Sequence, residues 1–119
     1  MSSSGFHRAD LREGKLRPAL LLGKLRGEHG DWLICMISSQ VRHYIPEFDE
    51  IVREEDSDFG TGGLRVVSVI RVGRLAVVEA DTLLGAVGEI ATDRLQRIKT
   101  RLSQWLEKAP SEASTEIGG

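Results

Sequence analysis

The 119-residue sequence contains a single cysteine, Cys35, which lies inside an apolar run. A lone cysteine excludes a disulfide within the chain and is typical of proteins of a reducing cytosol. The longest apolar runs span only a handful of residues, far short of the roughly 20 that a membrane helix needs. The N-terminal residues also lack the apolar segment of a signal peptide. We therefore expect a cytoplasmic protein with no membrane partner.

Metal-ligand motifs and an excess of one charge are missing as well. Cys35 and the three histidines, His7, His29 and His43, have no spacing typical of a metal site, so the sequence predicts neither a metal nor another cofactor. Sixteen basic and 18 acidic side chains give a net charge of −2, which neither favours nor excludes a polyanionic partner. With 40% hydrophobic residues, the chain can build the core of one domain.

A hairpin pattern at residues 16–40 is the strongest positive signal, with two apolar runs of strand length on either side of a polar turn. Arg17 opens the first run, and Ser38, Ser39 and Gln40 close the second. Because the start of one antiparallel strand lies beside the end of its neighbour, these side chains should meet at one end of the sheet. A guanidinium next to hydroxyls and an amide suits the binding of a phosphate.

These side chains also have ordinary structural explanations. Arg17 could be a solvated residue at a sheet edge, and the serine hydroxyls could satisfy backbone groups where a strand ends. The distribution of charge bears on the choice: residues 64–78 contain basic side chains and no acid, whereas acids concentrate in residues 47–58. A nearly neutral chain can thus carry a basic face for a phosphate-rich ligand, with scattered surface charge as the alternative.

Beyond the hairpin, the pattern predicts a mainly β fold with a C-terminal helix. Four further segments are expected to be strands: residues 51–52, 64–72, 75–78 and 87–90. Gly73 should mark a turn or bulge, and residues 54–63 should form a loop. Apolar residues at three- and four-residue spacing then predict a helix that is capped by Thr92 or Asp93 and ends before Pro110.

The same pattern divides the chain into three parts. Residues 1–13 are expected to be a tail and loop, residues 14–108 the folded domain, and residues 109–119 a disordered tail. Several short strands followed by a terminal helix predict a small barrel-like sheet with a helix against one opening.

Four stretches of the sequence, taken in this order, resemble the PemK/MazF family of toxins from bacterial toxin–antitoxin pairs. They are residues 14–22 (GKLRPALLL), 36–40 (MISSQ), 68–72 (SVIRV) and 88–90 (GEI), the last followed by the amphipathic helix. The resemblance implies an SH3-like small barrel that usually forms a homodimer. It also implies a metal-independent, sequence-selective endoribonuclease that cleaves single-stranded RNA and is inhibited by a cognate antitoxin. Any contact with operator DNA would be made through the antitoxin.

Carried over residue by residue, the resemblance matches the family's motif at Arg17, Ser38, Gln40 and Arg71, and Lys15 and Ser39 are added because they stand in the same stretches. The catalytic residues are Arg17 and Ser38, and the RNA-binding residues are Lys15, Ser39, Gln40 and Arg71. Arg17 stays protonated and offers a fork of donors, which suits stabilising a charged phosphorane. Ser38 suits holding a phosphate oxygen by a hydrogen bond.

The sequence departs from the family at two places. Some members carry an acid two residues after the arginine that matches Arg71, but Gly73 stands there, so the general base is unassigned and Glu13 is a weak substitute. The chain also begins after the family's first strand, as a shortened copy or with a true start upstream. A barrel without that strand would expose an edge, which with the apolar stripe of the helix favours a homodimer. These departures keep open a non-catalytic RNA- or antitoxin-binding barrel, or an inert remnant.

Overall fold

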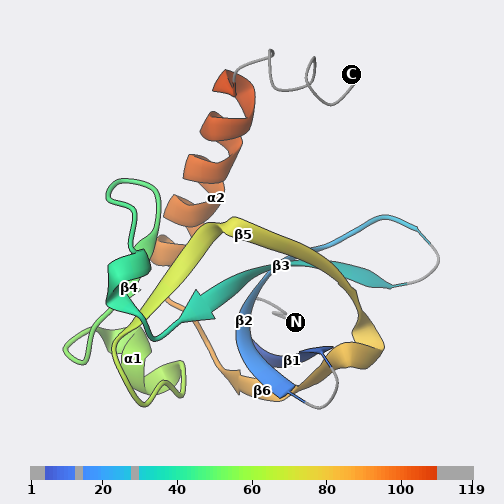
Figure 1. The fold of residues 1–119 in the computed structure, drawn as a ribbon, viewed down its shortest axis with the longest axis horizontal. Coiled ribbons are helices and arrows are strands. Elements are labelled where there is room, and N and C mark those ends of the chain that lie inside the picture. Colours follow the sequence, from blue (N-terminus) through green and yellow to red (C-terminus); the bar gives the residue numbers. More distant parts are fainter. Residues whose placement is uncertain (1–4, 13–14, 28–29, 110–119) are drawn as a thin grey trace.

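The computed structural model describes residues 5–12, 15–27 and 30–109, and it shows a curved antiparallel sheet with one long helix (Figure 1). The strands are β1 (Phe6–Arg12), β2 (Lys15–Lys24), β3 (Asp31–Ser38), β4 (Glu50–Val52), β5 (Ser68–Glu79) and β6 (Leu83–Gly88). The helices are η1 (Val41–His43), α1 (Ser57–Thr61), η2 (Ala80–Thr82) and α2 (Thr92–Lys108). The six strands pair in the order β4-β5-β3-β2-β1-β6, and the curl of this sheet gives the expected small barrel-like form.

The predicted hairpin is confirmed. Strands β2 and β3 pair antiparallel, with Ala19 opposite Met36 and Leu20 opposite Cys35. Arg17 lies two residues before Ala19, and Ser38 lies two residues after Met36, so both stand at the same end of the hairpin. The register therefore brings together the two residues that sequence analysis singled out.

The prediction for the N-terminal segment is wrong. Residues 6–12 form a strand and not a tail or loop, so the sheet does not lack a first strand. Strand β1 pairs with β2, where Phe6 is opposite Leu20, and also with β6, so it lies inside the sheet and not at an edge. The ring of Phe6 is fully buried. The sequence pattern is weak because, among the side chains of β1 that the structure describes, the buried Phe6 and the small Ala9 are separated by the polar His7 and Arg8. Residues 1–4, Glu13 and the predicted tail after Ala109 lie outside the described residues.

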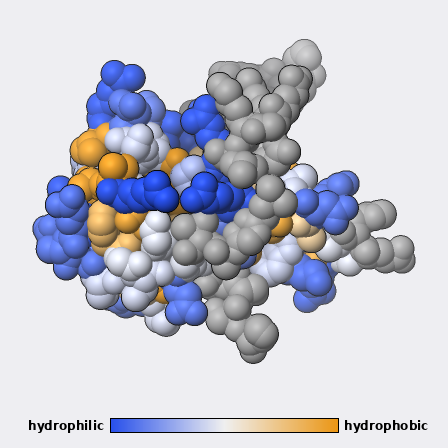
Figure 2. Space-filling view, turned by 90° about the horizontal axis from the view of Figure 1, so that it is seen from below, coloured by the Kyte–Doolittle hydropathy of each residue, from blue (hydrophilic) through white to orange (hydrophobic). Residues whose placement is uncertain are grey.

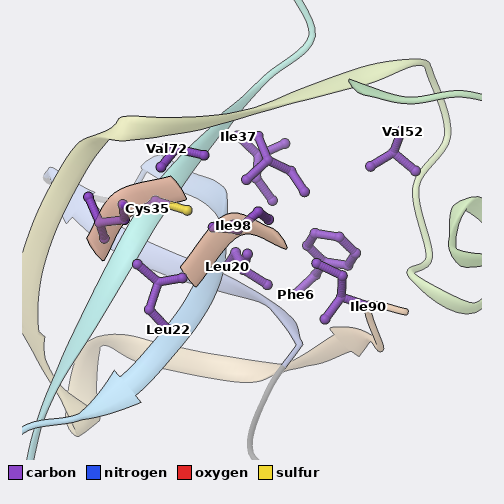
Figure 3. Packing of buried hydrophobic residues seen from close by; sticks show 11 residues of the cluster. Phe6, Leu20, Leu22, Cys35, Ile37, Val52, Val72, Ile90 and Ile98 are labelled. Atoms are coloured by element: carbon purple, nitrogen blue, oxygen red, sulfur yellow. The ribbon is translucent and has the colours of Figure 1, made fainter. Parts of the chain in front are cut away.

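Both faces of the hairpin are covered, which explains its continuous apolar runs. Leu20, Leu22 and Cys35 belong to the main core, where Ile98 of α2 lies among the strand side chains (Figure 3). The alternate residues Leu21 and Ile34 belong to a second cluster. Burial and the nearby charge of Asp49 raise the pKa of the Cys35 thiol to about 12, so Cys35 is an unreactive core residue.

The later sheet follows the prediction at Gly73 and departs from it elsewhere. Instead of two strands, β5 is one long strand with a bulge: Met36 of β3 is opposite Arg71, whereas Cys35 is opposite Leu75. Residues 72–74 therefore have no partner on β3, as the glycine indicated. β4 is confirmed, β6 begins four residues earlier than expected, and the predicted loop at residues 54–63 contains α1.

Asp49, which is 2% exposed, holds the bulge in place. Its Oδ1 accepts a hydrogen bond from the N–H of Val72 (3.0 Å), a donor that the bulge removes from pairing with β3. Its Oδ2 accepts a hydrogen bond from the N–H of Ile45 (3.0 Å). One buried carboxylate thus fixes the bulge of β5 to the segment that follows η1.

The predicted helix α2 is confirmed, but it begins at Thr92 and its N-cap is Ala91, without a side-chain hydrogen bond. The N–H of Ala91 donates instead to Oδ2 of Asp58 in α1, at 3.1 Å. The same carboxylate accepts from Nε of Arg94 at 2.7 Å, and Nη1 of Arg94 donates to Oε1 of Glu50 at 2.8 Å. The predicted Thr92 or Asp93 cap is therefore wrong, because an acid distant in sequence performs that role.

Elsewhere on the molecule, apolar and hydrophilic side chains are interspersed on the face seen from below in Figure 2. None of the described helices is long and apolar enough to cross a membrane.

Candidate functional site

A pocket of about 940 Å³ opens at the end of the sheet where β2 begins and β3 ends. Its walls come from these strands, the bulged part of β5, η1 and the segment before β5. The polar residues that line it are Arg8, Arg17, Ser38, Ser39, Gln40, His43, Arg65, Ser68, Arg71 and Arg74. The antiparallel register of the hairpin and the bulge of β5 create this site together.

Five of the six site residues expected from the sequence line this pocket: Arg17, Ser38, Ser39, Gln40 and Arg71. Lys15 belongs to β2, but its side chain lies outside the described residues. Sequence analysis included Lys15 for its place beside Arg17, and its contact with RNA stays a prediction.

The pocket is strongly positive. Five arginines line it, and its described lining residues include no aspartate or glutamate. Within the described part of the chain, none of these arginines forms an ion pair or a side-chain hydrogen bond. Guanidinium groups without carboxylate partners keep their donors for an anionic ligand. The arrangement therefore suits a ligand with several negative charges, such as the phosphates of a nucleic acid.

A hydrogen-bonded chain of Gln40, Ser38 and His43 forms one wall of the pocket. Oγ of Ser38 accepts from the N–H of Gln40 at 2.9 Å and lies 3.0 Å from Nδ1 of His43. Partial burial lowers the pKa of His43 below its ordinary value of 6.5, and the charges of Arg71, Arg42 and Arg74 lower it further. His43 is thus held neutral near neutral pH, in contact with a residue that was expected to be catalytic.

Sequence analysis assigned no role to five polar residues of this site: Arg8, His43, Arg65, Ser68 and Arg74. Arg8 was missed because its segment was expected to be a tail, although it pairs with Pro18 next to Arg17. His43 was considered only as a metal ligand, and the available signal was its position five residues after Ser38. Across the described residues, no group of three or more His, Cys, Asp or Glu side chains could hold a metal ion.

Comparisons with known proteins agree with this fold. Residues 6–106 match the model of the family described as PemK-like, MazF-like toxin of type II toxin–antitoxin system, and the chain belongs to this family. The match includes β1, which supports the corrected N-terminus. The family consists of toxins that act as endoribonucleases.

Two solved structures share the fold. The Mycobacterium tuberculosis toxin MazF-mt6 has a TM-score of 0.65 and 17% identity, over 87% of this chain and 96% of that one. An endoribonuclease in complex with its cognate antitoxin, from Mycobacterial species, has a TM-score of 0.64 and 19% identity, over 90% of this chain and 95% of that one. A search of curated protein sequences found no match.

Proposed function

We propose that this protein is the toxin of a type II toxin–antitoxin pair and a metal-independent, sequence-selective endoribonuclease that cleaves single-stranded RNA. The observation that carries the proposal is the pocket itself: five arginines without carboxylate partners among the described residues line the same cavity as Ser38. Membership of the PemK/MazF family supports RNA as the polyanion.

The reaction requires three events at one phosphodiester: activation of the 2′-hydroxyl, stabilisation of the charged phosphorane and departure of the 5′-oxygen. In the proposed mechanism, Arg17 donates to the equatorial oxygens of the phosphorane, because a guanidinium remains charged and offers paired donors. Ser38 donates a hydrogen bond to a phosphate oxygen. Ser39, Gln40 and Arg71, which line the same pocket, contact the adjoining nucleotides.

A cognate antitoxin is the second partner in this proposal. One similar structure is an endoribonuclease in complex with its cognate antitoxin, and we propose that an antitoxin likewise inhibits this chain. Mixing the purified toxin with the antitoxin should abolish RNA cleavage at a one-to-one ratio of binding sites. Continued cleavage in a saturated complex would contradict this part of the proposal.

We also propose a homodimer, on one of the two grounds that the sequence offered. The argument from a missing first strand no longer applies, because β1 is present inside the sheet. The remaining support is the end of α2, where Trp105 and Leu106 are 50% and 60% exposed. Light scattering at micromolar concentration should give twice the mass of the chain, and a monomer would overturn this state.

The decisive test of function is the chemistry of the product. Purified protein should cleave labelled single-stranded RNA in EDTA and leave a 2′,3′-cyclic phosphate and a 5′-hydroxyl. A substrate with 2′-O-methyl groups should remain intact, because its 2′-oxygen cannot attack. Cleavage that requires added magnesium would contradict the mechanism. Salt-sensitive binding without cleavage would favour the alternative, a non-catalytic RNA- or antitoxin-binding barrel.

A further inference from the structure

None of the residues given a role so far can remove the proton of the 2′-hydroxyl in the proposed reaction. Gly73 occupies the position at which the family resemblance would place an acid. The described lining of the pocket contains no carboxylate either. Arginine is a poor proton acceptor because it remains protonated in proteins. His43 is the one histidine in the described lining, and it is the group there that can accept a proton near neutral pH.

The contacts of Ser38 determine what His43 can do. The Oγ atom of Ser38 already accepts a hydrogen bond from the N–H of Gln40. If Nδ1 of His43 donates to the second lone pair of this oxygen, the Ser38 proton remains free for a phosphate oxygen. The same tautomer leaves a lone pair on Nε2. One arrangement thereby provides both a Ser38 donor to the phosphate and a base at Nε2. In the opposite tautomer Ser38 donates to Nδ1 and Nε2 carries the proton, so Nε2 is a donor and cannot act as a base.

From this geometry we infer that His43 is the general base of the RNA cleavage proposed above, with Ser38 as the group that orients it. The inference rests on the proposed function. Nε2 of His43 removes the proton of the 2′-hydroxyl as the 2′-oxygen bonds to phosphorus. The bond from phosphorus to the 5′-oxygen breaks, and the leaving 5′-oxygen takes a proton from water. The products are a 2′,3′-cyclic phosphate and a 5′-hydroxyl, and no redox partner is needed.

The charges around His43 fit this role. The groups that act on it are Arg71 and Arg74 of β5 and Arg42 of η1, together with the hydroxyl of Ser38. Three cations disfavour a fourth, so the imidazole is neutral and able to accept a proton at physiological pH. They also stabilise the negative charge that develops as the proton leaves the 2′-oxygen. The rate should therefore rise with pH and reach a plateau, and the midpoint of this acidic limb should lie below the ordinary histidine pKa.

The test compares His43→Asn with the wild type on a labelled single-stranded RNA in EDTA. The asparagine amide can still donate to Ser38 but cannot act as a base. We expect kcat to fall by roughly 10²- to 10⁴-fold with little change in KM, and the acidic limb of the pH profile to vanish. Added imidazole should restore part of the activity of His43→Ala. Full activity of His43→Asn would overturn the inference while leaving the proposed function intact.

Two further measurements separate a base from other roles. On an RNA with a 5′-bridging sulfur, whose departure needs no acid, His43→Asn should lose as much rate as on ordinary RNA. Recovery of the rate there would show a general acid and overturn the inference. Arg42→Gln, which removes a cation that lies outside the pocket lining, should shift the acidic limb to higher pH. An unmoved limb would also count against His43. If the wild type cleaves no RNA, the proposed function and the inference both fail.

Discussion

Two groups of arginines show how differently one side chain is used in this protein. On α2, Arg94, Arg97 and Arg101 all pair with Glu50, and Arg94 also contacts Asp56 and Asp58. In the pocket, five arginines line a cavity whose described residues include no acid. The first group finds its anions within the chain, and the second is available to anions from outside. The position of the acids in the fold, and not the number of arginines, therefore decides which arginines stabilise the fold and which are available to a ligand.

Within the paired group, Arg94 is the most deeply buried arginine. Burial alone would lower the pKa of Arg94, but its hydrogen bond with Asp58 and the charges of Asp58, Glu50 and Asp56 outweigh this and raise it. Arg94 therefore stays charged although its side chain is only 9% exposed. Such a buried cluster is costly to break, because any unpaired member is a charge without solvent.

The largest expected effect comes from breaking the paired group at its centre. Arg94→Met leaves Asp58 and Glu50 in a buried site with fewer donors, so the free energy of unfolding should fall by about 3–5 kcal/mol. Urea unfolding followed by circular dichroism measures this change. The control is Arg97→Met, whose side chain is 45% exposed; it should cost under about 1 kcal/mol. Equal losses in the two variants would mean that burial does not distinguish these arginines.

Arg17 provides the opposite test. Arg17→Ala removes a cation without a described ion-pair partner, so unfolding should change by no more than about 0.5 kcal/mol. Its kcat/KM on RNA should fall roughly 10²- to 10³-fold, as when one preorganised donor to a transition state is removed. Arg17→Lys retains the charge but not the paired donors and should recover only part of the loss. A folded, fully active Arg17→Ala would exclude this residue from the mechanism.

Ser38 should give the next effect in size. Ser38→Ala removes the donor to the phosphate and the partner of His43, so the cleavage rate should fall by more than about tenfold. Single-turnover kinetics on labelled RNA measure the chemical step directly. Ser39→Ala is the matched control for the chemical step, because its hydroxyl has no described contact with His43. As a proposed RNA contact, Ser39 should affect RNA affinity and leave the single-turnover rate at saturating protein unchanged. The hypothesis fails if both alanine variants cleave at the wild-type rate.

The smallest expected effect is on the salt dependence of RNA affinity, which should differ between the pocket arginines and the paired arginines. If the pocket arginines contact phosphates, a plot of log RNA affinity against log salt concentration should have a negative slope of about 0.7 for each phosphate contact. Arg74→Gln should make this slope shallower by about that amount, whereas Arg101→Gln, on the paired group, should leave it unchanged. Fluorescence anisotropy at several salt concentrations gives both slopes. Equal slopes would show that Arg74 makes no phosphate contact.

The sequence predicted the hairpin and its end residues because antiparallel geometry is local. Once β2 and β3 are recognised, the pairing of Ala19 with Met36 follows within a residue or two, and Arg17 and Ser38 come together. The bulge at Gly73 was also visible, because glycine interrupts an otherwise β-branched run. These features depend on neighbouring residues and on one turn.

What the sequence did not reveal depends on distant partners. Helical periodicity assigned Arg94 to the polar face, and its burial follows from acids 36 to 44 residues earlier in the chain. Helix α1 lies in a glycine-rich stretch, and Gly62 is held close to Phe6 of β1. The contact of His43 with Ser38 requires the single turn of η1, which has no apolar pattern of its own.

The adjacent buried acids Asp49 and Glu50 link the two halves of the comparison. Asp49 fixes the bulge of β5 through the N–H of Val72, and the next residue gathers the arginines of α2. The residue that holds the bulge of the pocket and the residue that holds α2 are therefore adjacent in the chain. We expect these parts to open together as one cooperative unit, so the amide of Val72 should exchange its hydrogen as slowly as the core amides of α2. Opening of this unit would remove the arginine-lined pocket and the docking of α2 in the same event, so a protease would encounter no partly folded form that retains the proposed site.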